Sequence, residues 1–250
     1  MTQTSPFRIG TRQSRLAMIQ AQMVRDMISE ALPNLRSELC DMRTSGDWKP
    51  EQGEVRLSQA AGGKGLFVKE IERALLAGET ACGVHSLKDI PSEMPDGLHI
   101  SHVIPAGDPR DAFVSAKFDT IESLPAGSLV GTSSLRRQAF LLHQRPDLKV
   151  EPLRGNVNTR LEKLHKGQVD AMFLAYAGLT RMALSHEATC ILSPQEMLPA
   201  CGQGVICIET RRDDTQTQAY LDKIHCRRTG IRCAAERAAL AMLGGNCHTP

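Results

Sequence analysis

Basic and hydroxyl side chains recur along the chain, each time directly after a short apolar run. Arginine forks match carboxylates through paired hydrogen bonds, lysine supplies a point charge, and hydroxyls add neutral donors. One such residue alone is typical of a solvated surface charge, but the recurrence indicates a cleft for a small polycarboxylate. The stretches are Arg12-Gln13-Ser14, Lys88-Asp89, Thr132-Ser133-Ser134-Leu135-Arg136-Arg137, Arg154-Gly155-Asn156 with Arg160, and Ala177-Gly178 with Arg181.

Asp89 is the lone acid that we single out among these cations. Neighbouring positive charge favours its ionised form, which suits a group that stabilises a developing cation. The alternative is a structural role, in which Asp89 is only the salt-bridge partner of a nearby arginine.

Alternating strands and helices must bring these stretches together. Repeated βα units predict parallel sheets with helices on both faces, and ligands of such sheets bind where the strands end. The pattern restarts near Asp108–Asp111, which indicates a second domain. Strands are expected at 7–11, 38–43, 82–87, 98–105, 129–131, 149–153, 171–175 and 205–209, and helices at 14–31, 66–77, 134–143, 157–166, 179–184 and over most of 215–243.

Composition excludes several classes of protein. Hydrophobic residues make up 41% and charged residues 23%, as in ordinary globular proteins. Aromatics at 4% argue against stacking on single-stranded nucleic acid, and the net charge of +2 gives no field for DNA or membranes. The sequence has neither an apolar run of about 18 residues nor an apolar signal core over 1–8, so we expect a cytoplasmic protein.

The eight cysteines form no C-x-x-C pair, and we expect most of them to be reduced, buried thiols with no metal site. Gly62-Gly63-Lys64-Gly65 precedes an expected helix and suggests a phosphate-binding loop. That motif would need glycine at Ser58 and a hydroxyl residue at Leu66, so a nucleotide triphosphate site is rejected. A glycine hinge is expected there instead.

The motifs together resemble the porphobilinogen deaminase (hydroxymethylbilane synthase) family. The resemblance runs in order from about residue 7 to 248, and it is carried by 8–14, 63–70, 84–89, 108–113, 131–137, 153–157, 202–204 and 235–238. Residues 84–89 are Val84-His85-Ser86-Leu87-Lys88-Asp89, and 131–137 are Gly131-Thr132-Ser133-Ser134-Leu135-Arg136-Arg137.

This resemblance implies a transferase that condenses four porphobilinogens head to tail, with loss of ammonia, into hydroxymethylbilane for heme biosynthesis. The chain would grow on a dipyrromethane cofactor joined by a thioether to Cys247. The expected partner is the small-molecule substrate alone, with no nucleic acid or membrane, and the protein is expected to be a monomer.

The resemblance also assigns the site residues. Asp89 is the expected catalytic residue. The expected cofactor-binding residues are Cys247, Lys88, Asp89, Thr132, Ser134, Arg136, Arg137 and Arg160. The expected substrate-binding residues are Arg12, Ser14, Arg154, Arg160, Arg181, Lys64 and Phe67.

The implied fold is α/β, with two domains that resemble type-II periplasmic binding proteins and a small, here truncated, α+β C-terminal domain. Domain 1 would be discontinuous, over 1–105 and 200–222, and domain 2 would span 106–199. The start of domain 3, at 223–250, would carry the cofactor cysteine.

Two rival hypotheses remain. A non-catalytic solute-binding or sensor domain of the same fold would share the anion cleft without needing both Asp89 and Cys247. An inactive deaminase would keep the motifs without turnover.

Overall fold

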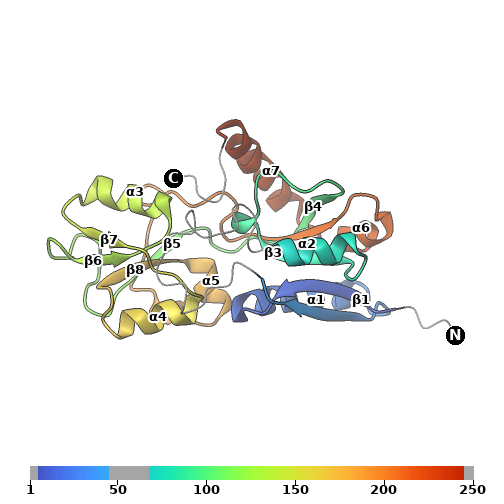
Figure 1. Ribbon diagram of the computed structural model, residues 1–250, viewed down its shortest axis with the longest axis horizontal. Helices are drawn as coiled ribbons and strands as arrows, with labels where there is room; N and C mark the ends of the chain where they lie inside the picture. Colours follow the sequence, from blue (N-terminus) through green and yellow to red (C-terminus); the bar gives the residue numbers. More distant parts are fainter. Residues whose placement is uncertain (1–4, 45–67, 245–250) are drawn as a thin grey trace.

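Two five-stranded β-sheets form the framework of the chain, for which a computed structural model describes residues 5–44 and 68–244. Figure 1 shows the two sheets in separate lobes, each accompanied by helices. The predicted α/β class is confirmed. Within the described ranges, no helix is both long and apolar enough to cross a membrane.

The first sheet joins strands from both ends of the chain. β1 pairs in parallel with β2 and β3, whereas β10 runs antiparallel to β3 and β4. The order across the sheet is β2 (Ser37–Met42), β1 (Phe7–Arg12), β3 (Cys82–Ser86), β10 (Ile206–Arg211) and β4 (Leu98–Val103).

The second sheet is built from the middle of the chain. β6 is parallel to β7 and β8, whereas β5 runs antiparallel to β8 and β9. The order is β7 (Lys149–Glu151), β6 (Leu129–Gly131), β8 (Ala171–Ala175), β5 (Asp111–Val114) and β9 (Cys190–Ile191).

The expectation of parallel sheets is therefore wrong for β10 and β5. Both strands are buried along most of their length, as central strands of parallel sheets also are, so an apolar run does not reveal strand direction. Each follows a connection between the two sheets, from which the chain enters its sheet in the opposite direction. The division into domains stays a prediction.

Helices pack on each sheet around separate cores. The first core includes Ile9, Val24 and Ile208, and the second sheet has apolar clusters around Phe113 and Leu174. α1 and α5 are in contact where the two lobes of Figure 1 meet. The helices are α1 (Arg15–Ala31), α2 (Lys69–Leu76), α3 (Leu135–Gln144), α4 (Val157–His165), α5 (Tyr176–Arg181), α6 (Thr215–Leu221) and α7 (Arg227–Met242), with 3-10 turns η3 (Leu87–Asp89), η4 (Ser185–Glu187) and η5 (Asp222–Ile224).

The two connections between the sheets touch at a pair of glycines. The Gly107 N–H donates to the Gly204 carbonyl over 3.0 Å. Gly204 has a φ of +84°, and a Cβ there would lie 2.7 Å from the Gly107 oxygen. Both the backbone conformation and the close approach therefore require glycine.

Gly204→Ala is expected to destabilise the protein more than Gly127→Ala, its matched control. Gly127 has a similar φ of +80°, but a Cβ there meets nothing within 4 Å. The left-handed conformation alone costs roughly 1–2 kcal/mol, and the clash at Gly204 adds about 1–3 kcal/mol more. Urea unfolding of both variants measures the difference, and equal losses would contradict the close approach.

Candidate active site

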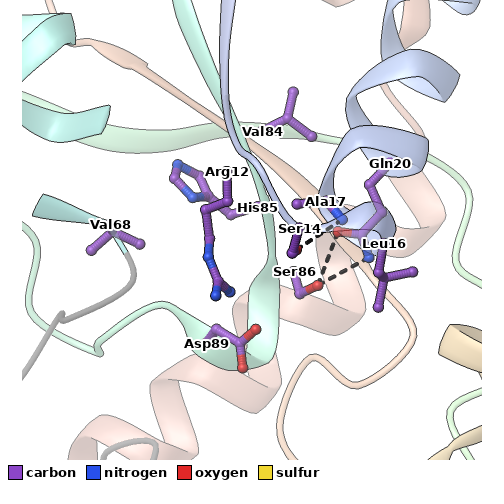
Figure 2. A pocket seen from close by; sticks show the side chains of 10 residues that line it. All are labelled: Arg12, Ser14, Leu16, Ala17, Gln20, Val68, Val84, His85, Ser86 and Asp89. Carbon is purple, nitrogen blue, oxygen red and sulfur yellow. Dashed lines mark hydrogen bonds between the residues drawn. The ribbon is translucent and has the colours of Figure 1, made fainter. Parts of the chain in front are cut away.

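A pocket lies at the edge of the first sheet where β1 and β3 end. Because these strands are parallel neighbours, Arg12 at the end of β1 and Asp89 in the turn after β3 reach the same edge. Figure 2 shows the Arg12 guanidinium extending toward the Asp89 carboxylate. The pocket is lined by Arg12, Ser14, Leu16, Ala17, Gln20, Val68, Val84, His85, Ser86 and Asp89.

Ser14 starts helix α1 at this pocket. Its hydroxyl oxygen accepts a hydrogen bond from the Ala17 N–H over 3.4 Å, as an N-cap does. Val24 and Ile28 are fully buried and hold the helix on the first core. The unsatisfied amides of the first turn and the helix dipole add positive potential beside Arg12.

Lys88 connects this pocket to the charges of the second sheet. Burial lowers the pKa of Lys88 to about 8, while the neighbouring Asp89 acts to raise it. Arg137, Asp111 and Arg136 also act on its charge. Cations predicted from separate stretches of the chain therefore influence one another across the two sheets.

Asp111 is a second acid among these cations, and the sequence analysis missed it. Its carboxylate is fully buried and lies 2.6 Å from Arg137 Nη2 and 2.8 Å from Arg136 Nη2. Gln203 Nε2 also donates to it over 3.0 Å. Desolvation alone would raise the pKa of the Asp111 carboxyl, but the two arginines hold it below its usual range. Asp89 is thus not the lone acid of the set.

Strand direction explains the omission. Asp111 is the first residue of β5, and it lies beside Ala175, the last residue of the antiparallel β8. In the same way Ile206, which begins β10, lies beside Ser86, which ends β3. The start of an antiparallel strand reaches the edge where its neighbour ends, whereas the sequence analysis considered only residues that follow strands.

Thr132 and Ser134 shape the start of helix α3. The Thr132 hydroxyl oxygen accepts from the Ser134 N–H over 3.2 Å, and the Ser134 hydroxyl oxygen accepts from the Arg137 N–H over 3.4 Å. Both hydroxyls thus accept backbone donors, and each retains its own proton to donate.

Arg154, Arg160 and Arg181 follow β7 and β8, which end at the same edge as β6. Arg154 is buried, and Arg160 Nε donates to the Gly155 carbonyl over 2.8 Å. Arg181 Nη2 donates to the Gly204 carbonyl over 2.6 Å, and burial lowers its pKa. Among the described residues, no acidic side chain lies close enough to oppose this lowering of the Arg181 pKa.

Three predicted site residues, Lys64, Phe67 and Cys247, lie outside the described residues. Their assignments stay predictions. In the ranges that are described, no group of three or more histidine, cysteine, aspartate or glutamate side chains is placed to hold a metal ion.

A buried ionisable cluster, which the sequence analysis did not single out, lies behind the pocket. His85 lines the pocket, and its Nε2 is 3.0 Å from Oε2 of the fully buried Glu209. Glu72 on α2 lies close enough to both groups for their charges to shift its pKa. Burial, reinforced by the Glu209 charge, raises the pKa of Glu72 to about 7.

Glu72→Gln is expected to stabilise the protein at pH 8 but not at pH 4. An unfolded glutamate has a pKa of about 4.3. Between that value and the folded pKa of about 7, the folded chain binds the extra proton, so its stability falls as pH rises. The penalty is complete above pH 7 and is absent below the unfolded pKa.

Urea unfolding at the two pH values measures this change in the free energy of unfolding. Glu30→Gln, on an exposed position of α1, is the matched control. An equal effect of Glu72→Gln at both pH values would contradict the raised pKa of Glu72.

The model of the family "Porphobilinogen deaminase, dipyromethane cofactor binding domain" matches residues 7–219. The chain belongs to the porphobilinogen deaminase family. A porphobilinogen deaminase of Nitrobacter hamburgensis is 50% identical over 244 residues, which cover 97% of this chain and 76% of that protein. One of Legionella pneumophila is 45% identical over 243 residues, which cover 97% and 77%.

Solved structures resemble the chain in fold alone. The methionine binding protein MetQ has a TM-score of 0.56 at 13% identity and covers 93% of this chain and 95% of its own. A nutrient binding protein from Burkholderia cenocepacia bound to methionine has a TM-score of 0.53 at 14% identity, covering 89% and 93%. Both agree with the expected binding-protein-like architecture.

The residues of this porphobilinogen deaminase family member fit its dipyrromethane cofactor, which carries several carboxylates. Arg181 is a half-buried cation without an opposing acid among the described residues, and burial likewise lowers the pKa of Lys88. Bringing carboxylates to such groups offsets the cost of their desolvation. Among the described residues, Lys88 interacts electrostatically with Asp89, Arg136, Arg137 and Asp111, and Asp111 also pairs with both arginines.

Proposed function

We propose that this chain condenses four porphobilinogen molecules head to tail, with release of ammonia, into hydroxymethylbilane. The observation that carries the proposal is the placement of Asp89 in a pocket with Arg12 and Ser14, in a member of this family. Asp89 stands where positive charge on a bound pyrrole can be stabilised, and the cations around it suit that pyrrole's acetate and propionate.

Asp89 stabilises the cation that forms when a porphobilinogen loses ammonia. The leaving amine takes its bonding electrons with it, and the pyrrole becomes an electron-poor methylene-pyrrolenine. A fixed carboxylate beside the pyrrole N–H is attracted more strongly to this state than to the neutral ring, and that difference is what accelerates the step. Proton transfer by Asp89 is a secondary contribution.

Basic and hydroxyl side chains hold the carboxylates. Arg12, Ser14, Arg154, Arg160 and Arg181, with Lys64 and Phe67, are the proposed substrate contacts. Lys88, Asp89, Thr132, Ser134, Arg136, Arg137 and Arg160 are the proposed cofactor contacts, and Cys247 is the proposed point of attachment. When bound, the dipyrromethane supplies the pyrrole to which the first substrate unit is joined.

The proposed setting is the cytoplasm, with the chain acting as a monomer on a small molecule alone. The net charge of +2 supports a small molecule as the partner, because it offers no general attraction to nucleic acid or anionic lipid.

Turnover of porphobilinogen by the purified chain tests the function. We expect ammonia and hydroxymethylbilane to appear in a ratio of four to one, measured by an ammonia assay and by the absorbance of the cyclised product after oxidation. Binding of porphobilinogen without its consumption would contradict the enzyme and favour the solute-binding alternative.

A further inference from the structure

Helix α7 contacts the backbone that follows the Asp89 turn and a second segment, at Gly202, that packs on the start of this turn. Arg237 Nη2 donates to the carbonyls of Pro91 and Ser92 over 2.8 and 3.3 Å, and Nη1 donates to the Ile90 carbonyl over 3.4 Å. These three residues directly follow Asp89 in the chain. The neighbouring Glu236 accepts a hydrogen bond from the Gly202 N–H over 2.7 Å.

The carbonyls after Asp89 need a donor from outside their own segment. Ile90 and Pro91 are buried, neither belongs to a strand, and buried carbonyls are costly without partners. Proline also contributes no N–H to a local turn. A guanidinium suits this place because its planar fork offers several N–H groups at once, whereas an ammonium offers donors from one atom only.

The second contact reaches the same turn from its other end. Gly202 has a φ of +68°, and a Cβ there would lie 2.7 Å from Leu87 Cγ. Leu87 is the first residue of η3 and Asp89 is the last. By holding the Gly202 N–H, Glu236 therefore fixes a segment that packs directly on the start of the Asp89 turn.

The carboxylate of Asp89 depends on this backbone support. Among the described residues, no donor hydrogen-bonds to it, so its position follows from the conformation of the turn rather than from side-chain partners. Catalytic groups must be held closely, since a displacement of about 1 Å costs on the order of 100-fold in rate.

We infer that Glu236 and Arg237 are positioning residues for Asp89: Arg237 acts through the backbone that follows its turn, and Glu236 through the Gly202 segment that packs on the start of the turn. This inference rests on the proposed function. Neither residue is among the described residues that line the pocket. They hold the catalytic carboxylate at the distance from a bound pyrrole at which it stabilises positive charge.

Steady-state kinetics with porphobilinogen test the inference on Arg237→Met, Arg237→Lys and Arg227→Met. Arg227 is the matched control, because it is exposed on the same helix and makes no side-chain hydrogen bond in the described part of the chain. We expect Arg237→Met to lower kcat by about 10–100-fold with little change in KM. The lysine variant should recover part of kcat, and Arg227→Met should match the parent.

The amount of folded, cofactor-loaded protein is measured for each variant by thermal unfolding and intact mass, and rates are expressed per loaded molecule. A parent chain that consumes no porphobilinogen would overturn the proposed function itself. An active parent with full kcat per loaded molecule in Arg237→Met would overturn the positioning role. So would a variant whose lost activity matches its lost loading, because that marks a structural role only.

Discussion

Asp89→Ala is expected to lower the turnover of porphobilinogen by at least about 10²–10³-fold while the protein stays folded. The loss follows because Asp89 is the one acid among the described residues that line the pocket with Arg12. The fold is retained because Asp89 is only half-buried and contributes no side-chain hydrogen bond among the described residues.

Asp89→Ala should also affect the neighbouring Lys88. Asp89 opposes the effect of burial on Lys88, so its removal should lower the pKa of Lys88 further below about 8. Asp96→Ala, an exposed acid in the segment that follows, is the matched control. Near-normal turnover by Asp89→Ala would contradict the assignment of the catalytic residue.

Arg137→Met is expected to lower the free energy of unfolding by about 1.5–3 kcal/mol, because it removes one of the two arginines that pair with the buried Asp111. Asp111 is fully buried and, within the described part of the chain, would keep Arg136 and Gln203 as partners. We also expect most of the purified variant to lack the dipyrromethane, since Arg137 is a proposed partner of its carboxylates. Urea unfolding and intact mass measure the two effects separately.

A double variant separates the structural role of Arg137 from its binding role. Asp111→Asn combined with Arg137→Met leaves Arg136 without an acidic partner among the described residues, so stability should fall below that of Arg137→Met, whereas the loss of the adduct should stay the same. Arg8→Met is the control, because the Arg8–Glu38 pair is exposed and should contribute little to stability. Full loading of Arg137→Met would show that other residues hold the carboxylates.

The sequence predicted most of the polar residues that lie where the parallel strands end. Arg12 and Asp89 were expected there because β1 and β3 are parallel, and the same rule brought Thr132 and Arg154 to the end of neighbouring strands. It failed for Asp111, which begins an antiparallel strand, and for Gln203, which precedes one. Periodicity carries no information on strand direction, so these two residues could be found only from the sheet itself.

The bounds of some strands and helices were predicted accurately, and those of others were not. β6 and β8 have the expected bounds, whereas β5 and β9 lie where the sequence pattern predicted no strand. The late helix was expected at 179–184 but spans Tyr176–Arg181. Ala183, at a φ of +58°, has the left-handed conformation that an α-helix does not continue through.

The contact of α7 with the Asp89 turn could not be predicted from the sequence. Arg237 and Ile90 are 147 positions apart, and nothing in the pattern of α7 distinguishes Arg237 from the exposed arginines on the same helix. Contacts at this separation depend on how the connections between the sheets fold back, which local propensity does not specify.

The mass of the purified chain tests the account most directly. When the protein is produced in a host that makes porphobilinogen, we expect an intact mass greater than that of the polypeptide by two pyrrole units. Peptide mapping should place the increase on the peptide that contains Cys247. An unmodified mass, from folded protein made in such a host, would contradict the assignment of the cofactor and of the reaction.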